Sequence, residues 1–412
     1  MTDSRIAVVG GSLGGLRAAE QLRRAGHAGP ITVYGAEPHP AYTRPPLSKE
    51  LLADPDVLDA EALAGRVELR RRSTVGDVDF RWGSRVVEAD PAAGRLTWRS
   101  ADAGSATRAA GFDGLVAATG LRPRRLPLPG PQRGRVALRT VDDCAELRAL
   151  LAGGPARVVV IGAGFVGVET ATTLRGLGHH TTVVEPAGPP MSRVIGDGPG
   201  RAIQAWHEGA GVEFVIGRGV EGVAGTERVT GVVLDDGTLL HADVVVEAVG
   251  SLPNVEWLAG AGLDLTDGVL CRNDLSVPGA DAMVAVGDVA RFPNPLFDDV
   301  PRRVEHWSMP ADTARRAAAT LVARLSDAAP DPTPFAPVPS FWSDQGQLRL
   351  QSSGMPALGV PRVDEGDPSD PLGGVLVSYH RDGRQVGTLA VNLSAARQRE
   401  LRDAAVHLPS TA

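Results

Sequence analysis

The sequence predicts an α/β protein with two Rossmann-like dinucleotide-binding domains and a C-terminal α+β domain. Two stretches, residues 5–37 and 157–185, each show a buried strand, a glycine-rich turn, a helix and a second strand with an acid at or just beyond its end. A third stretch, the proline- and aspartate-rich segment 329–334, separates a final part of the chain in which strand and turn patterns predominate.

The central stretch begins with the β-branched run 158–161, which is typical of a strand buried on both faces. The G-x-G-x-x-G motif at 162–167 follows directly. Its first glycine permits a tight turn, its second lets the backbone approach a pyrophosphate, and its third lets the helix pack closely on the strand. The order of elements favours a nucleotide site over a turn without a ligand. The candidate binding residues of this loop are Gly162, Gly164, Phe165, Val166 and Gly167.

An acid closes the second strand of this central unit. The strand Thr182–Val184 ends in Glu185, whose carboxylate can bind both hydroxyls of an adenosine ribose and would repel a 2′-phosphate. No arginine replaces it in the residues that follow directly. The sequence therefore predicts NADH in preference to NADPH.

Residues 5–37 repeat the pattern near the N-terminus. The strand 6–9 leads into a glycine loop in which Ser12 stands for the middle glycine, and the second strand, 31–34, is followed by Glu37. Two nucleotide units in one chain suggest two different dinucleotides, usually a flavin that stays bound and a nicotinamide that exchanges. A duplicated module with one inactive site is the alternative. The candidate residues here are Gly10, Ser12, Leu13, Gly14, Gly15 and Glu37.

Composition excludes several classes of function. The chain has 412 residues, a net charge of −7 and no long basic run, so a nucleic-acid partner is not expected. It shows neither a signal peptide nor an apolar stretch long enough to span a membrane, and we expect a cytoplasmic protein. Cys144 and Cys271 are far apart, which argues against a disulfide framework or a metal site.

The segment 42–50 contains two prolines, Arg44 and the only lysine of the chain, Lys49. A chain that uses arginine for nearly all its 42 basic residues keeps lysine where arginine would not fit, so Lys49 is a candidate for a specific contact. Ser48 is expected to cap a helix that begins near Glu50. The sequence R-P-P-L-S-K after such a unit resembles the flavoprotein ferredoxin reductases, including putidaredoxin and rubredoxin reductases and the reductase components of dioxygenases.

This resemblance extends over nearly the whole chain and implies a glutathione-reductase-like arrangement with FAD in the first unit and NADH in the second. It implies flavin-side contacts for a set of residues that come from many segments: Arg44, Lys49, Val86, Ala118, Thr119, Gly120, Arg139, Gly250, Gly287, Glu305, His306 and Trp307. It implies nicotinamide-side contacts for Glu169 and Arg193 and places Trp342, in F-W-S-D-Q, at the exposed flavin edge. The chain departs from the family at Ser308-Met309-Pro310 and at Thr313.

Asp288 follows a strand-end glycine, where its carboxylate can bind the ribitol hydroxyls of FAD. With this second flavin segment, the predicted domains are residues 1–122 (FAD, first segment), 123–243 (NAD), 244–328 (FAD, second segment) and 329–412 (C-terminal α+β).

The resemblance implies transfer of electrons from NADH through FAD to an iron–sulfur ferredoxin that serves a cytochrome P450 or a Rieske oxygenase. Lys49 is expected at the flavin N5, paired with Glu169, and Trp342 at the exit edge; these three are the catalytic candidates. Disulfide reductases need a redox cysteine pair, and the related oxidases and peroxidases need a cysteine before Arg44; the sequence has neither. The remaining alternative is an FAD- and NADH-binding interaction protein, similar to apoptosis-inducing factors, with slow turnover.

Overall fold

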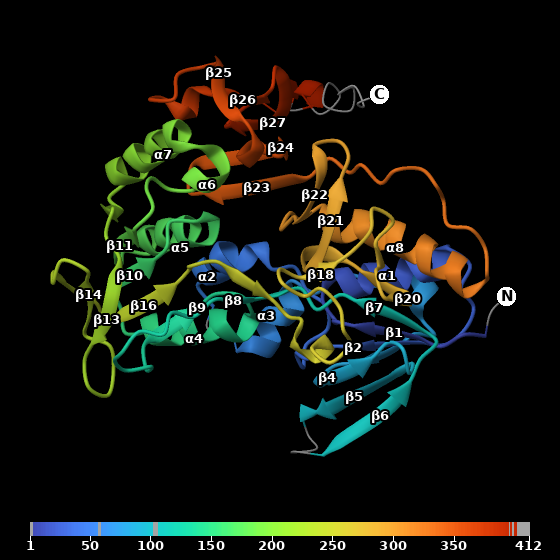
Figure 1. The fold of residues 1–412 in the computed structure, drawn as a ribbon. Helices are drawn as coiled ribbons and strands as arrows, with labels where there is room; N and C mark the ends of the chain where they lie inside the picture. Colours follow the sequence, from blue (N-terminus) through green and yellow to red (C-terminus); the bar gives the residue numbers. More distant parts are fainter. Residues whose placement is uncertain (1–2, 57–58, 102–105, 395, 398, 402–412) are drawn as a thin grey trace.

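The structure, a computed structural model, describes residues 3–56, 59–101, 106–394, 396–397 and 399–401. Figure 1 shows two α/β parts side by side, with the C-terminal strands lying across the top of the view. The first α/β part, on the right, combines the blue N-terminal elements with orange elements from much later in the chain.

The main sheet of the first part has the strand order β19–β20–β7–β1–β2–β3. Its strands are β1 (Ile6–Val9), β2 (Ile31–Tyr34), β3 (Asp79–Arg81), β7 (Gly114–Ala117), β19 (Ser276–Val277) and β20 (Ala280–Ala285). β1 pairs in parallel with β2 and β7, and Val8 lies opposite both Val33 and Val116. β19 pairs antiparallel with β20, which pairs in parallel with β7. Two distant segments therefore build this sheet.

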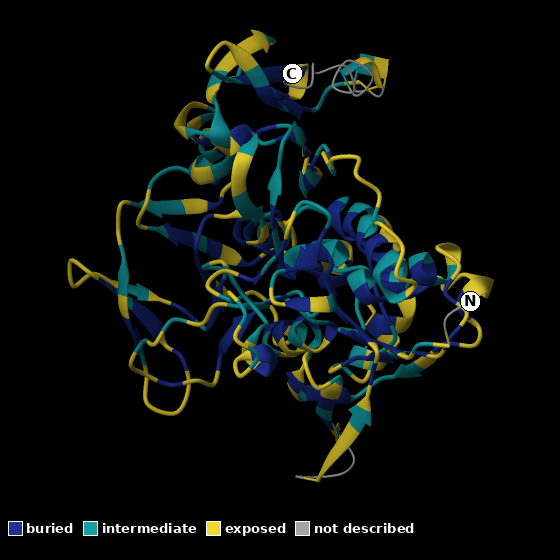
Figure 2. Cartoon of the chain, turned by 45° about the vertical axis from the view of Figure 1, so that its right-hand side comes forward, coloured by how far each residue is buried: buried dark blue, intermediate teal, exposed yellow. Residues whose placement is uncertain are grey.

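Helices and a small antiparallel sheet cover the first sheet. α1 (Leu13–Arg24) packs against α8 (Met309–Leu325), which also contacts β20. β4 (Ser84–Asp90), β5 (Arg95–Ser100) and β6 (Thr107–Gly111) form the antiparallel sheet. Leu96 and Trp98 of β5 join the same hydrophobic core as β1 and β7. In Figure 2 the central strands are dark blue, whereas β6, at one edge of the antiparallel sheet, is largely yellow.

The second part contains the sheet β12–β11–β10–β16–β9. Its strands are β9 (Arg135–Ala137), β10 (Arg157–Ile161), β11 (His180–Glu185), β12 (Glu213–Ile216) and β16 (Val244–Glu247). Val158 and Val160 face one hydrophobic core while Val159 and Ile161 face another. The prediction of a strand buried on both faces is confirmed.

Helices cover one face of the second sheet and a small antiparallel sheet covers the other. The helices of this region and of the preceding segment are α2 (Glu50–Ala53), α3 (Ala60–Arg66), α4 (Val141–Leu151), α5 (Phe165–Gly176), α6 (Ser192–Ile195) and α7 (Asp197–Gly209). The antiparallel strands are β13 (Val220–Ala224), β14 (Gly231–Leu234) and β15 (Leu239–His241).

The predicted return to the first part at residue 244 is too early. β16 pairs with β10 and β9 in the middle of the second sheet, because its three consecutive valines fill a position buried on both sides. The chain changes parts through the antiparallel pair β8 (Leu121–Pro123) and β17 (Ser251–Pro253). Beyond this pair, β18 (Val269–Leu270), β21 (Ala290–Asn294) and β22 (Asp298–Arg303) form a further small sheet.

A buried ion pair holds the crossover, which is the proline-rich segment 124–134 between β8 and β9, against the second sheet. Arg135 of β9 and Glu247 of β16 are fully buried and 2.6 Å apart. Glu247 also accepts a hydrogen bond from the backbone N–H of Leu126, and Arg135 donates to the carbonyls of Leu126 and Leu128. The proline-rich crossover is thereby held by charge-assisted hydrogen bonds.

The C-terminal strands form the antiparallel sheet β23–β24–β27–β26–β25. They are β23 (Ser340–Gln345), β24 (Leu348–Gly354), β25 (Val360–Glu365), β26 (Val375–Arg381) and β27 (Arg384–Val391). Leu350, Val377 and Tyr379 belong to the same hydrophobic core as Met191 and Ile195 of the second part. The C-terminal sheet therefore packs on the second part as well as closing over the junction between the two.

Candidate functional site

The first glycine loop joins β1 to α1 and has little room for side chains. Gly10 has φ +120°, and a Cβ built on it would lie 2.0 Å from the carbonyl oxygen of Ala118. A Cβ on Gly15 would lie 1.8 Å from the carbonyl oxygen of Gly10. Ser12 is the N-cap residue of α1, but no side chain among the described residues caps this helix. The first turn of α1 therefore presents backbone N–H groups, as a pyrophosphate site requires.

Glu37 lies beyond β2 and is held by Arg44 and Tyr42. Arg44 donates to the Glu37 carboxylate at 2.6 Å, to the Tyr42 hydroxyl at 2.9 Å and to the Arg139 carbonyl at 2.7 Å. It also lies 3.4 Å from the Ser12 hydroxyl, which brings it to the glycine loop. Burial alone would raise the pKa of Glu37, but Arg44 and the Tyr42 hydroxyl outweigh this and hold it below its usual range. The acid is thus ionised and fixed in orientation.

The second flavin segment supplies a further acid at the same cradle. Asp288, in the short turn Gly287–Val289 after β20, lies 3.6 Å from the Arg139 guanidinium. Burial raises the pKa of Asp288 above its ordinary value, and Arg139 opposes this rise. The backbone N–H of Gly287 donates to the hydroxyl of Thr313, one of the residues at which the chain departs from the family resemblance.

Two buried nitrogens close to this cradle have no hydrogen-bond partner among the residues that the structure describes: Arg139 Nε and His306 Nδ1. Burial lowers the pKa of His306 to about 4, so its ring is neutral near pH 7. A buried polar nitrogen without a partner is costly unless a ligand satisfies it. Together with the glycine loop and the two acids, these nitrogens fit FAD.

The loop at 118–120 lies against the residue that follows β17. The Thr119 hydroxyl donates to the Asn254 carbonyl at 2.6 Å, and the Asn254 side chain donates to the Thr119 carbonyl at 3.0 Å. Gly120 and Gly250 both have positive φ and flank the strands β8 and β17. Val86, for which the resemblance implies a flavin-side contact, lies in β4 at a β-bulge that interrupts the ladder.

The second glycine loop has the same geometry as the first. A Cβ on Gly162 would lie 2.4 Å from the Ala248 carbonyl oxygen, and one on Gly167 would lie 2.1 Å from the Gly162 carbonyl oxygen. The space around Gly164 is open, and Val166 in the first turn of α5 is exposed. No side chain among the described residues caps α5. This loop can cradle a second pyrophosphate.

Glu185 ends β11 beside this loop. Its carboxylate accepts hydrogen bonds from the backbone N–H groups of Ala163 and Ala187, both at 2.9 Å. Arg193 is exposed on α6 and forms no ion pair with the described residues. The structure therefore brings Glu185 to the glycine loop but does not pair it with Arg193.

An ion pair joins the first part to the second. Lys49 Nζ lies 2.6 Å from Glu169 Oε2, and both side chains are largely buried. Lys49 also donates to the Pro45 carbonyl at 3.0 Å. Glu169 lies in the first turns of α5, directly after the second glycine loop, so this pair stands between the two cradles. The pairing expected from the sequence is present.

Aromatic side chains of β23 contact rings from α5 and from the segment just before α8. Trp342 of β23 meets Trp307 edge-on at 5.7 Å between ring centroids. Phe341 contacts both Phe165 and His306, at 4.7 and 5.0 Å. Glu305, which precedes His306, is exposed and is bonded instead to Ser251 and Arg303. The C-terminal sheet thus brings Trp342 next to Trp307, while Glu305 is bonded to Arg303, whose guanidinium also donates to the Asp288 carbonyl.

Sequence reasoning missed several polar neighbours of Glu169 and misread one. The Ser48 hydroxyl does not cap a helix; it donates to Glu169 Oε2 at 2.6 Å, because the side chain is buried and faces α5. Ser343, Gln345 and His207 continue the hydrogen bonds from the other side of the carboxylate. The F-W-S-D-Q motif contains Ser343 and Gln345, but nothing in the sequence pairs it with residue 169.

Comparison with known proteins agrees with this geometry. The family model described as pyridine nucleotide-disulphide oxidoreductase matches residues 4–318. The ferredoxin–NAD(+) reductase component of the anthranilate 1,2-dioxygenase system from Burkholderia cepacia is 36% identical over 95% of this chain and 92% of its own length.

Solved structures show the same relationship. The ferredoxin reductase for the CYP199A2 system from Rhodopseudomonas palustris has a TM-score of 0.84 at 33% identity, with 97% of this chain and 94% of that chain covered. The covalent putidaredoxin reductase–putidaredoxin complex gives 0.85 at 28% identity, with 98% and 93% covered. This chain belongs to the pyridine nucleotide-disulphide oxidoreductase family.

Proposed function

We propose that this protein is an NADH-dependent ferredoxin reductase that uses FAD to pass electrons to a small iron–sulfur ferredoxin. The observation that carries the proposal is the Lys49–Glu169 pair, which stands where two dinucleotide cradles meet. The relatives are named as reductase components of dioxygenase and P450 systems, so the terminal acceptor is an oxygenase of one of these types. They do not favour the alternative of a slow FAD- and NADH-binding interaction protein.

The two cysteines argue against thiol chemistry. Cys144 and Cys271 are both buried and unpaired. Burial raises the pKa of Cys144 to about 11 and that of Cys271 to about 12, so neither is a reactive thiolate near pH 7.

A cytoplasmic location, predicted from the sequence, is part of the proposal. Among the described residues, no helix has both the length and the apolar character needed to cross a membrane.

In this proposal, residues 1–122 and the segment from β17 to residue 328 bind FAD, residues 123–247 bind NADH, and residues 329–412 complete the acceptor side. Gly10, Gly15 and the first turn of α1 hold the pyrophosphate of FAD, Glu37 holds its ribose, and Asp288 with Arg139 holds its ribitol chain. Gly162, Gly167 and Glu185 hold the corresponding parts of NADH. Bound FAD supplies the conversion of a hydride into single electrons.

The chain's own groups act by position and charge. Lys49 places a cation at the reacting edge, where negative charge develops, and Glu169 fixes the direction of its ammonium group. Burial of this pair excludes water from the edge. Trp342 and Trp307 cover the side from which electrons leave.

The experiment that tests this function is an anaerobic titration of the flavin-loaded protein with NADH, followed by visible absorbance. A [2Fe–2S] ferredoxin and cytochrome c are then added. We expect bleaching of the flavin, then ferredoxin-dependent reduction of cytochrome c. Absence of bound flavin, or bleaching without ferredoxin-dependent turnover across several ferredoxins, would contradict the proposal.

Replacing Lys49 by alanine is expected to slow flavin reduction by NADH about ten- to hundredfold, because a cation that faces the developing charge is removed. Stopped-flow absorbance measures the rate constant. Arg66→Ala, which removes a more exposed cation paired with Asp54 and Asp56, is the control and should leave the rate unchanged. A flavin-replete Lys49→Ala protein with wild-type reduction kinetics would refute this role.

Replacing Glu185 by alanine is expected to shift the ratio of kcat/KM for NADH over NADPH by about tenfold or more towards NADPH, because a carboxylate no longer repels the 2′-phosphate. Steady-state kinetics with both nucleotides measures the ratio. Glu213→Ala changes an acid at the opposite end of the neighbouring strand β12 and should leave the ratio as it is. A wild-type preference for NADPH would overturn the assignment.

A further inference from the structure

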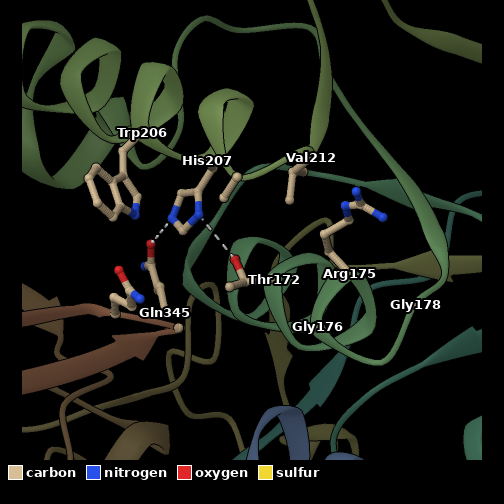
Figure 3. Close-up of a pocket in the computed structure, with 11 residues that line it drawn as sticks. Thr172, Arg175, Gly176, Gly178, Trp206, His207, Val212 and Gln345 are labelled. Atoms are coloured by element: carbon tan, nitrogen blue, oxygen red, sulfur yellow. Dashed lines mark hydrogen bonds between the residues drawn. The ribbon is translucent and has the colours of Figure 1, made fainter.

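A continuous series of hydrogen bonds leads away from Glu169 and returns to the second part at His207. It passes through the C-terminal strand β23 and ends at α7, beside a groove of about 480 Å³ that is lined by α5, α7 and the turn after β23. Figure 3 shows its outer end, where Gln345 points up from β23 to His207 and Thr172 lies on the other side of the imidazole ring. None of these groups binds a dinucleotide in the function proposed above.

The direction of each hydrogen bond follows from the number of protons available. The Glu169 carboxylate accepts hydrogen bonds from Ser48 and Lys49 on Oε2. On Oε1 it accepts one from the Ser343 hydroxyl, at 2.5 Å. The single proton of Ser343 is committed to Glu169, so its oxygen can only accept a second bond. The Gln345 amide nitrogen fills that place at 3.0 Å.

This arrangement fixes the orientation of the Gln345 amide. Its nitrogen faces Ser343 and also lies 3.4 Å from the Met191 sulfur, so its oxygen must face His207. A carbonyl oxygen only accepts, and His207 Nε2, 3.0 Å away, must therefore carry a proton. Every donor in the series consequently points towards the Glu169 carboxylate.

The series crosses the junctions of the molecule within buried surroundings. Ser48 and Lys49 come from the first part, Glu169 and His207 from the second, and Ser343 and Gln345 from the C-terminal sheet. Glu169, His207, Ser343 and Gln345 are all buried. Burial lowers the pKa of His207, with partial opposition from Gln345, so the ring is a neutral donor.

We propose that Gln345 and His207 are positioning residues that act through Ser343 to fix the Glu169 carboxylate, and with it Lys49, at the reacting edge. The inference rests on the proposed function, since it concerns the same ion pair. Without Gln345, the Ser343 hydroxyl can turn to other acceptors and the carboxylate loses a fixed donor on Oε1. Docking of the C-terminal sheet is then a condition for the correct geometry of Lys49.

The test compares two variants that remove buried hydrogen bonds between the C-terminal sheet and the second part, to His207 and Met191 in one case and to Ile195 in the other. Gln345→Leu breaks the series to Glu169. Tyr379→Phe removes a bond of 2.8 Å from the Tyr379 hydroxyl to the Ile195 carbonyl, which has no connection to Glu169. Thermal unfolding, the midpoint potential of the bound flavin and the rate of flavin reduction by NADH are measured for both.

We expect both variants to lose stability, but the reduction of flavin by NADH to become about fivefold slower in Gln345→Leu only. Its flavin potential should also fall, because the Lys49 cation is less well placed. Ser343→Ala, a smaller change, should show the same two effects in a protein that folds. Wild-type potential and rate in both Gln345→Leu and Ser343→Ala, or an equal change in Tyr379→Phe, would overturn the inference.

Failure of the proposed function gives a different result. If NADH does not reduce the flavin of the wild-type protein, the function itself is wrong. If wild-type protein is reduced and the three variants match it, only the positioning role is wrong.

Discussion

Replacing Gly10 by alanine is expected to give a protein that does not retain FAD. The residue has φ +120°, and a methyl group would lie 2.0 Å from the carbonyl oxygen of Ala118. The positive φ and the clash each cost about 1–3 kcal/mol, and relief requires β1 and the 118–120 turn to separate. That movement would open the loop that holds the pyrophosphate. The measurement is the visible flavin absorbance of the purified protein, before and after addition of free FAD.

Gly65→Ala is the matched control. Gly65 lies in α3, its φ is not positive, and no atom lies within 4 Å of the added methyl group. This variant should retain FAD fully, and alanine should stabilise the helix slightly. A Gly10→Ala protein with one FAD per chain and wild-type affinity would show that the first loop does not hold the cofactor.

Replacing Glu247 by alanine is expected to lower the free energy of unfolding by about 3–5 kcal/mol. The side chains of Arg135 and Glu247 are 1% and 0% exposed, so removal of the acid leaves a buried guanidinium without its partner. The Leu126 N–H loses its acceptor in the same step. Chemical denaturation, followed by circular dichroism, measures the loss.

Two further variants define the cause of that loss. Glu247→Gln keeps the shape and an acceptor for Leu126 but removes the charge, and should lose an intermediate amount. Arg201→Ala breaks an exposed pair with Asp197 in α7 and should change stability by no more than about 0.5 kcal/mol. Equal stability of Glu247→Ala and Arg201→Ala would mean that the buried pair does not hold the crossover.

The parts of the site that the sequence predicted depend on local chemistry. The two glycine loops follow from residues within one strand–turn–helix unit, since positive φ and close packing there demand glycine. Glu185 and Glu37 follow from their place just after a strand. The link between Lys49 and Glu169 spans distant segments, and it came from the resemblance of short motifs and the unique lysine.

The parts that it did not predict depend on packing between distant segments. Ser48 was assigned to a helix end because its neighbours suggested one, whereas its burial against α5 turns the hydroxyl to Glu169. Gln345 and His207 meet only because β23 lies across the second part. The valines of β16 fit a buried strand in either sheet, and only pairing with β10 decides between them.

The interrupted first sheet affects how the protein forms during synthesis. β7 pairs with β20, which leaves the ribosome only after the whole second part has been made. Until then β7 remains an open edge beside β1, and α1 lacks α8, against which it packs. The second part, whose strands β9 to β16 are continuous in sequence, completes its sheet first. The FAD cradle, including Asp288, therefore closes after the second sheet, and the nascent chain has an unpaired strand edge exposed to aggregation until it does.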